Sequence, residues 1–418
     1  MPDLRSFSAR SPGTPGRRWL IEGACIVLVA VIAALLFLVR YQDPARAASG
    51  DSFWYMRQAL IFTGVDAETA RVRVEHIMCQ DINRSLADKH QKPTCKSYDT
   101  TKITQRYRAI FDSRPGYPLF GAPFVAVLGP WTGMMAATLV LAMVAGVLAY
   151  LAVWMASGLR LAGILASAAL FVLPTGFWMS RMLVESGMVA GFLAVLIGAM
   201  LIQRGRRSGI ALISVALIWL FAARSASGLA MSLVLLGAGA LSLVHRESRR
   251  SGAIIAGLGA AGAVGWQLLS KVLGLPGFNE TVQDFATRHF KDPDIPDPVP
   301  WLIEQNLKFW PTVPLTDLMD LVKPAALLLV VAVFVVRLRP VAALWIFTGL
   351  IGVAMIVAHP VHTEWERLTL PLWIPVAAVL GFGTALALTR PARTPDPAGP
   401  PSPEEAPGPP VTAPAQVG

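Results

Sequence analysis

Charged residues are scarce in this sequence, and their scarcity limits what the protein can be. Only 15% of its 418 residues are charged, 54% are hydrophobic, and the mean hydropathy is +0.55. Because a typical soluble domain has about 25% charged residues, the composition excludes an ordinary soluble protein. The apolar residues form blocks long enough to cross the roughly 30 Å hydrocarbon core of a bilayer. The sequence therefore predicts a polytopic integral membrane protein.

Further absences exclude particular functions. The sequence has no Gly-rich phosphate loop and no nucleophile elbow, so cytoplasmic nucleotide chemistry has no support. Its apolar blocks hold almost no ionisable residue at mid-depth, where transporters usually bind their cargo. The formal net charge of +10 comes largely from Arg residues in short loops, which is an orientation signal. We therefore expect no nucleic-acid partner.

Cysteine is also rare. Of the three cysteines, Cys25 lies inside an apolar run, whereas Cys79 and Cys95 share the first long polar segment. These two are the natural disulfide pair if that segment faces an oxidising compartment. His359 and His362 form a His-x-x-His pair without further ligands nearby, which is too weak a pattern for zinc. No metal site is predicted from these residues.

The order of apolar runs predicts an all-α bundle. We expect about ten transmembrane helices, near residues 19–39, 132–156, 160–178, 183–202, 210–223, 226–244, 252–270, 323–337, 341–358 and 369–389. The membrane domain therefore covers residues 19–389. A Ser-, Pro- and Arg-rich start (1–18) and a Pro-rich tail (390–418) flank it, and both are expected to be disordered in the cytoplasm.

Basic loops give the predicted orientation. Alternating sides from a cytoplasmic N-terminus places each compact Arg cluster inside the cell. These clusters are Arg204/Arg206/Arg207, Arg246/Arg249/Arg250, Arg337/Arg339 and Arg390/Arg393. The same alternation places residues 41–131, 271–322 and 359–368 outside, with both termini in the cytoplasm. We expect a plasma-membrane protein with its polar chemistry on the extracytoplasmic side.

The outer segments carry helical patterns of their own. Helical spacing occurs at Ser52–Phe62 and Glu68–Met78 in the first loop, and at Val282–His289 in the second. The stretch 114–124 is apolar but broken by three prolines, which favours an interfacial segment over a clean span. The first large loop should therefore contain short interfacial helices.

Asp51 is the candidate chemical centre. It follows the first span by about a dozen residues, close to the interface. A carboxylate there can deprotonate an acceptor hydroxyl or hold a divalent cation. Outer arginines suit a phosphate, because a guanidinium presents a rigid fork of donors to its oxygens. Those arginines are Arg57, Arg114, Arg181, Arg224 and Arg367.

Three short motifs resemble the GT-C fold glycosyltransferases, which include protein mannosyltransferases and aminoarabinose transferases. They are Asp51…Tyr55…Ala59, the Pro/Tyr segment Arg114–Leu119, and the late-loop segment Glu366–Pro371. The resemblance implies inverting transfer of a sugar from a polyprenyl-phosphate donor to an extracytoplasmic glycan, lipid or protein. It also implies that Asp51 is the catalytic residue. Ser52 stands where many relatives carry Glu, so a metal-free general base is the preferred role.

The remaining site candidates fall into two groups. Residues assigned to the donor phosphate are Arg57, Arg114, Arg224, Glu366 and Arg367. Residues that could line the cavity are Tyr55, Asp112, Tyr117, Arg181 and Glu185. Simpler interpretations stay open: a helix N-cap for Asp51, a loop salt bridge for Asp112, and an ion pair between Glu366 and Arg367. A lipid or solute transporter and a non-catalytic scaffold are the alternative functions.

Overall fold

The computed structural model describes residues 15–42, 48–244, 246–312, 318–338 and 341–389, and every regular element in these ranges is a helix. The predicted disordered tail (390–418) and residues 1–14 of the predicted disordered start lie outside the described residues. Helix α1 begins at Pro15, four residues before the predicted first span. The predicted all-helical fold is confirmed for the described part of the chain.

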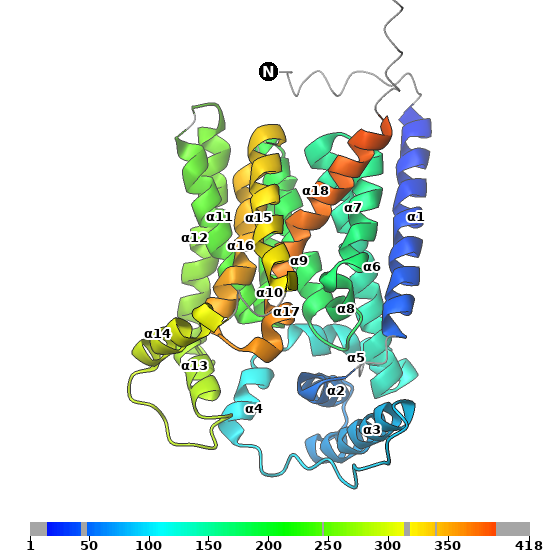
Figure 1. Cartoon of the computed structure of the whole chain (residues 1–418), viewed down its shortest axis with the longest axis vertical. Helices are drawn as coiled ribbons and strands as arrows, with labels where there is room; N and C mark the ends of the chain where they lie inside the picture. Colours follow the sequence, from blue (N-terminus) through cyan, green and yellow to red (C-terminus); the bar gives the residue numbers. More distant parts are fainter. Residues whose placement is uncertain (1–14, 43–47, 245, 313–317, 339–340, 390–418) are drawn as a thin grey trace, which may run out of the picture.

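Long, roughly parallel helices make up the body of the molecule (Figure 1). They are α1 (Pro15–Tyr41), α6 (Pro130–Ser157), α7 (Arg160–Val172), α9 (Glu185–Gln203), α10 (Ser208–Ala223), α11 (Ser225–Leu243), α12 (Arg249–Val272), α15 (Leu318–Arg337), α16 (Ala342–Ala358) and α18 (Leu370–Thr389).

Among the described residues, six helices are long and apolar enough to cross a membrane. These are α1, α6, α9, α11, α12 and α18. The other four predicted spans correspond to shorter apolar helices: α7, α10, α16 and the part of α15 from Ala325 to Arg337. The helices are those of an integral membrane protein, and the count of ten spans stays a prediction.

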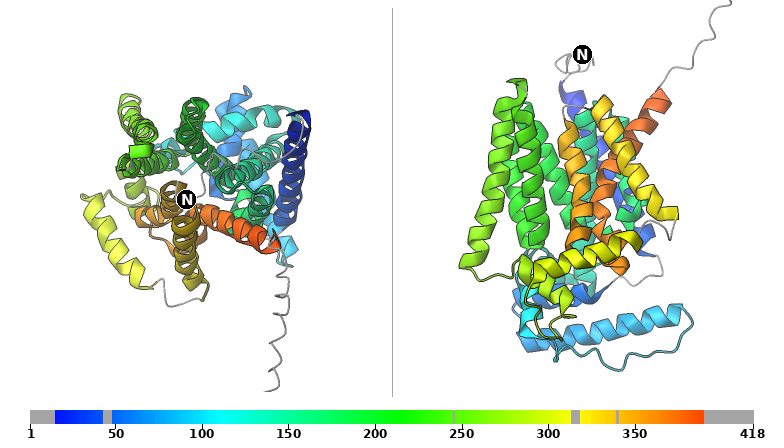
Figure 2. Two further views of the ribbon diagram at one scale, coloured as in Figure 1. Left: turned by 90° about the horizontal axis from the view of Figure 1, so that it is seen from above. Right: turned by 60° about the vertical axis from the view of Figure 1, so that its left-hand side comes forward.

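Short helices gather at one end of this bundle, here called the loop end, which is the lower end in Figure 1. Figure 2 shows α3 lying across this end, nearly at right angles to the bundle. The helices there are α2 (Gly50–Phe62), α3 (Ala67–Asp88), α4 (Gln105–Asp112), α5 (Gly116–Leu128), α13 (Phe278–Ala286), α14 (Pro298–Phe309) and α17 (Trp365–Leu368). Other short elements are α8 (Pro174–Met179), η3 (Trp310–Thr312) and η5 (His362–Glu364), whereas η2 (Arg246–Ser248) joins α11 to α12 at the opposite end of the bundle (Figure 1).

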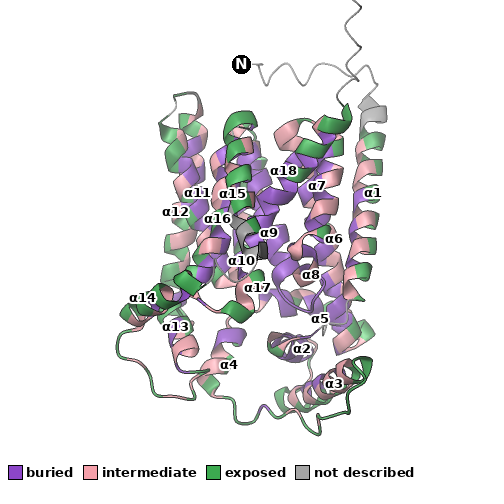
Figure 3. Ribbon diagram, viewed as in Figure 1, coloured by how far each residue is buried: buried purple, intermediate pink, exposed green. Residues whose placement is uncertain are grey.

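Helix α9 is the centre of the packing. Its apolar window is 94% buried, against 17% for α1 and for α12, whose exposed apolar faces suit contact with lipid (Figure 3). Glycine allows the close approach of α10: a Cβ on Gly187 would lie 2.6 Å from the Trp219 ring. The Trp219 Nε1–H donates to the Gly187 carbonyl at 2.8 Å. The N-terminus of α9, which carries Glu185, is thereby fixed within the bundle.

A second close contact positions two arginines. A Cβ on Gly116, at the start of α5, would lie 2.8 Å from the Ala222 carbonyl carbon and 2.9 Å from the Ala223 nitrogen. Only glycine allows these two backbones to come so near without a shift. Because Gly116 is two residues from Arg114 and Ala223 immediately precedes Arg224, this contact brings both arginines to the loop end.

The expected features of the first loop are present. Helices α2 and α3 cover the two stretches with helical spacing, and α3 continues to Asp88. Cys79 and Cys95 form a disulfide with Cα atoms 5.5 Å apart, which confirms that prediction. Asn83 supports the bridge, because its side chain bonds both the N–H (3.0 Å) and the carbonyl (2.9 Å) of Cys95. The disulfide therefore fixes the chain that follows α3 against its C-terminal half.

Candidate functional site

Asp51 lies in the first turn of α2, where its charge is favoured by the helix dipole. The N-cap is Ser49, so the N-cap interpretation of Asp51 is not what the structure shows. The Ser49 N–H donates to Ser52 Oγ at 2.9 Å, and the Ser52 hydroxyl donates to the Met182 carbonyl at 2.7 Å. Ser52 therefore anchors the start of α2 beside the start of α9.

A single guanidinium joins the two carboxylates at this place. Arg367 on α17 donates from Nη2 to Asp51 Oδ2 at 2.7 Å and from Nε to Glu185 Oε1 at 2.5 Å. Side-chain exposure is 23% for Asp51, 11% for Arg367 and zero for Glu185. A buried carboxylate is stable only when it is paired, so Arg367 compensates Glu185 as well as Asp51.

Two more arginines complete what we call the Asp51 cluster: Asp51, Glu185, Arg367, Arg224 and Arg114. Arg224 Nη1, between α10 and α11, lies 3.8 Å from Glu185 Oε1. Burial raises the pKa of Asp51, but the charges of Arg367, Arg114 and Arg224 outweigh it, and the pKa lies below its usual range. Asp51 is therefore an ionised carboxylate throughout the neutral pH range.

The cations of the cluster differ in how well they are compensated. Burial lowers the pKa of Arg367, but Glu185 and Asp51 raise it more, so this guanidinium is held firmly in its charged form. Burial and the charge of Arg367 lower the pKa of Arg224, whose ion-pair contact among the described residues is the more distant one to Glu185. Arg224 consequently gains more from a bound anion than Arg367 does.

Two buried tyrosines pack beside the cluster. The rings of Tyr55 and Tyr117 meet edge to face with centroids 5.1 Å apart. The Tyr117 hydroxyl bonds Thr138 Oγ1 at 2.6 Å, whereas the Tyr55 hydroxyl is buried without a hydrogen-bond partner in the described part of the chain. Burial and the nearby charge of Asp51 raise the pKa of Tyr55 to about 12. Tyr55 is therefore a protonated hydroxyl next to the charged groups.

Asp112 and Arg57 have their contacts outside the cluster. Asp112 accepts from Gln58 Nε2 at 2.9 Å and from Arg108 at 3.1 Å, so it forms the loop salt bridge that was the simpler interpretation. Arg57 is buried on the same side, near Arg108 and Asp112. Arg181 is buried, with its guanidinium 4.2 Å from the centre of the Phe177 ring.

The acidic residue beside Arg367 differs from the one suggested by the sequence. Glu366 is exposed on α17, and Glu364 Oε2, just before the helix, lies 4.0 Å from Arg367 Nη1. Arg367 pairs with Asp51 and Glu185 instead of with its neighbour Glu366. The nearness of Glu364 to Arg367 could have been predicted from the sequence, because residues three apart share a helix face. The contact between Ser52 and Met182 could not, because no local pattern connects these two residues.

The carboxylates of the cluster do not fit a divalent cation. Asp51 and Glu185 both face the Arg367 guanidinium, whose positive charge occupies the place a cation would need. Within the described ranges, no group of three or more His, Cys, Asp or Glu residues is arranged to hold a metal ion. His359 and His362 each pack against a different aromatic ring, Phe285 and Phe309.

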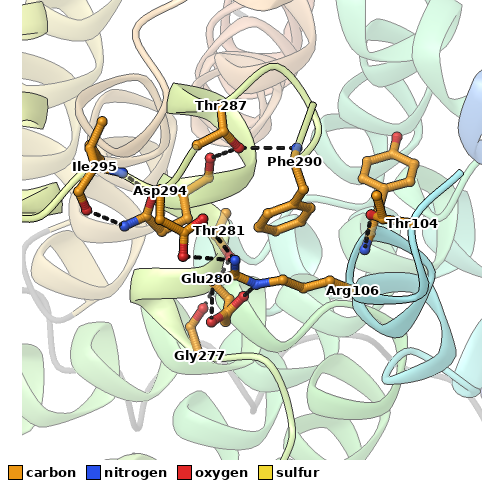
Figure 4. A network of polar contacts seen from close by, with 11 residues as sticks. Thr104, Arg106, Gly277, Glu280, Thr281, Thr287, Phe290, Asp294 and Ile295 are labelled. Atoms are coloured by element: carbon orange, nitrogen blue, oxygen red, sulfur yellow. Dashed lines mark hydrogen bonds and ion pairs between the residues drawn. The ribbon is translucent and has the colours of Figure 1, made fainter. Parts of the chain in front are cut away.

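A second polar network joins the two large loops at the loop end (Figure 4). Arg106 on α4 donates to both carboxylate oxygens of Glu280, at 2.6 and 2.9 Å, and to Asp294 at 2.8 Å. Its guanidinium carbon lies 4.4 Å from the centre of the Phe290 ring. A cavity of about 510 Å³ adjoins this network, and Arg106 and Glu280 in its wall are already bonded to each other. We assign the network a structural role.

Comparison with known proteins gives this chain no family: no protein-family model matches it and no curated protein is similar to it.

Proposed function

We propose that this chain is an integral membrane glycosyltransferase of the GT-C type, which transfers a sugar from a polyprenyl-phosphate donor to a hydroxyl acceptor. The observation that supports the proposal most is the Asp51 cluster itself. Three arginines and two carboxylates from five distant parts of the sequence meet at one end of an apolar bundle. A carboxylate base next to incompletely compensated cations is what the transfer of a sugar from a phosphate requires.

The proposed topology has ten spans, with the N-terminus in the cytoplasm and the loop end outside. The Arg-bearing turns from α9 to α10 and from α11 to α12, and the end of α15 that carries Arg337, lie at the opposite end (Figure 1). Their position favours this orientation under the positive-inside rule. The cluster is then at the outer boundary of the membrane, where a polyprenyl chain can remain among the apolar helices while its phosphate reaches the arginines. The exposed apolar faces of α1 and α12 are compatible with such lipid contact.

The proposed reaction follows from the charges. Arg224 and Arg114 hold the donor phosphate, which also competes with Asp51 for Arg367. Asp51 accepts the proton of the acceptor hydroxyl as its oxygen attacks the anomeric carbon. The bond from that carbon to the phosphate oxygen breaks, and the polyprenyl phosphate leaves with the bonding electron pair. Attack opposite the leaving group inverts the configuration at the anomeric carbon, in line with the GT-C resemblance.

The test is transfer of labelled sugar from polyprenyl-phosphate donors by purified protein in lipid nanodiscs. A positioned general base contributes about 10²- to 10⁴-fold to the rate. We therefore expect Asp51→Asn to lose at least about 100-fold in kcat on that scale while it inserts and folds normally. Asp99→Asn, an exposed loop carboxylate, is the matched control. Near wild-type turnover by Asp51→Asn would remove Asp51 from the mechanism.

A further inference from the structure

Two buried polar atoms beside Asp51 have no hydrogen-bond partner within the described residues: the hydroxyl of Tyr55 and the Oε2 atom of Glu185. Both side chains are fully buried. Buried polar atoms almost always have a partner in protein or in a bound molecule, because leaving one unsatisfied forfeits its hydration without a replacement hydrogen bond. Two such atoms next to one charged cluster indicate a ligand that supplies the missing hydrogen bonds.

Polar atoms directly beside these two have partners within the protein. Tyr117, whose ring touches that of Tyr55, has its hydroxyl bonded to Thr138 at 2.6 Å. The other oxygen of Glu185 receives Arg367 Nε at 2.5 Å. Tyr55 and Glu185 therefore each keep one buried polar atom that no described residue satisfies, as does the nearby Ser186. The charges of Asp51 and Glu185 both act on Tyr55, which indicates that the three residues lie close together.

The two unsatisfied atoms, the Tyr55 hydroxyl and Glu185 Oε2, determine which hydrogen-bonding groups the ligand must have. A carboxylate oxygen accepts hydrogen bonds only, and a tyrosine hydroxyl can both donate and accept. A ligand with neighbouring hydroxyl groups meets both requirements. An ammonium group fits poorly, because a donor on Glu185 Oε2 would lie near Arg367 and Arg224, which already approach Glu185 at 2.5 and 3.8 Å. Like charges at such separations repel each other strongly in a buried place.

We propose that Tyr55 and Glu185 form a subsite for the hydroxyl groups of a neutral sugar, which makes the donor a phosphate ester of an uncharged sugar and disfavours an amino sugar. The inference rests on the proposed function, since it places the sugar beside the base Asp51. The raised pKa of Tyr55 agrees with it, because a protonated hydroxyl can donate to a ring oxygen or accept from a sugar hydroxyl.

The experiment measures binding by the full-length protein in nanodiscs, so that it does not depend on turnover. Three compounds are titrated: farnesyl phosphate, its mannosyl ester and its 4-amino-4-deoxyarabinosyl ester. The quantity of interest is the sugar increment, defined as the dissociation constant of farnesyl phosphate divided by that of each ester. We expect an increment well above one for mannose and a smaller one for the amino sugar.

Tyr55→Phe should reduce the mannose increment about three- to tenfold, the usual worth of one neutral hydrogen bond, and leave farnesyl phosphate binding unchanged. Tyr117→Phe is the matched control and should keep the increment. In the ligand-free protein the pattern reverses. Tyr55→Phe removes an unsatisfied hydroxyl and should not lower the melting temperature, whereas Tyr117→Phe loses its bond to Thr138 and should lower it.

The outcomes separate the subsite from the proposed function. If farnesyl phosphate binds through Arg224 but the sugar adds nothing, or Tyr55→Phe keeps the increment, the subsite is overturned and the phosphate site stands. A larger increment for the amino sugar overturns the neutral-sugar assignment. If the folded protein binds neither farnesyl phosphate nor its esters, both the subsite and the proposed function are rejected.

Discussion

Arg367 Nη2 and Asp51 Oδ2 lie 2.7 Å apart, although 316 residues separate the two side chains in the sequence. The pair connects the first turn of α2 to the short helix α17, just before the last helix of the bundle. Since Arg367 also bonds the fully buried Glu185, it is the group on which both carboxylates depend. Most of the predictions below concern this dependence.

Removal of the Arg367 charge should destabilise the folded protein. In Arg367→Ala the ion-pair partner left to Glu185 among the described residues is the more distant Arg224, and breaking a buried pair typically costs about 3–5 kcal/mol. We expect the free energy of unfolding in mild detergent to fall by an amount near that range. Arg367→Ala combined with Glu185→Gln should recover part of the loss, because the uncompensated charge is gone. Equal stability of the single and double variants would contradict this role for Arg367.

The pH dependence of transfer should reveal the same pair. The pKa of Asp51 is held below its usual value of about 3.9, so its base form persists as pH falls and is lost only below that value. In Arg367→Gln the main opposing charge is absent while burial still raises the pKa. The acid limb of kcat/KM should therefore move to higher pH in this variant. Arg106→Gln, in the network of Figure 4, should keep the wild-type limb. An unmoved limb in Arg367→Gln would show that Asp51 is not the titrating base.

The lowered pKa of Asp51 should also make the stability of the protein depend on pH. Because this pKa is lower in the folded than in the unfolded protein, ionised Asp51 contributes fully to the free energy of unfolding above about pH 4. That contribution is lost as the pH falls through the folded-state pKa. Asp51→Asn should therefore flatten the acid side of the curve of melting temperature against pH. A curve that parallels the wild type down to pH 2 would count against the assignment.

The disulfide should stabilise the first loop. On the chain-entropy estimate, a bridge across 16 residues contributes about 3 kcal/mol. Replacing Cys79 and Cys95 by Ser should increase proteolysis between residues 88 and 98 and speed amide exchange in the C-terminal half of α3. Cys25→Ser is the control, since Cys25 is the free cysteine on α1. Unchanged cleavage in the double Ser variant would show that the loop is held by other contacts.

The proposed orientation can be tested by labelling single cysteines in intact cells, in a chain whose native cysteines are replaced by Ser. Lys92, in the first loop, and Arg206, between α9 and α10, are both exposed and lie near opposite ends of the bundle. Lys92→Cys should react with a membrane-impermeant maleimide before the cells are broken, and Arg206→Cys only afterwards. The reverse result would invert the topology and place the Asp51 cluster in the cytoplasm.

Sequence reasoning predicted the location of the site better than its contacts. Asp51, Glu185 and Arg367 were all identified because each lies at or beyond the predicted outer end of a span. Their meeting on one guanidinium was not predictable, since it depends on how the helices pack. Arg57 was included as an arginine of the first predicted outer loop. A separation of six residues turns it to another side of α2, whereas Tyr55, four residues on, shares the face of Asp51.

The fold also divides into features that depend on local sequence and features that depend on packing. The length of the apolar runs predicted the long bundle helices, and helical spacing predicted α2 and α3, because both signals are local. The close contact of Gly116 with Ala222 and Ala223 depends on packing and left no local pattern. That contact nevertheless places Arg114 and Arg224 at the same end of the molecule. Arg114 and Arg224 therefore meet in the Asp51 cluster for a reason that the sequence does not contain.

The position of Arg367 on α17 also bears on how the protein is made. Glu185 is synthesised 182 residues before the arginine that neutralises it, and the last long helix, α18, follows directly after. During translation the Glu185 carboxylate has to stay near water until the C-terminal helices enter the bilayer. Chains that stop before α17 would lack the closest compensating charge of Glu185, at the start of their central helix.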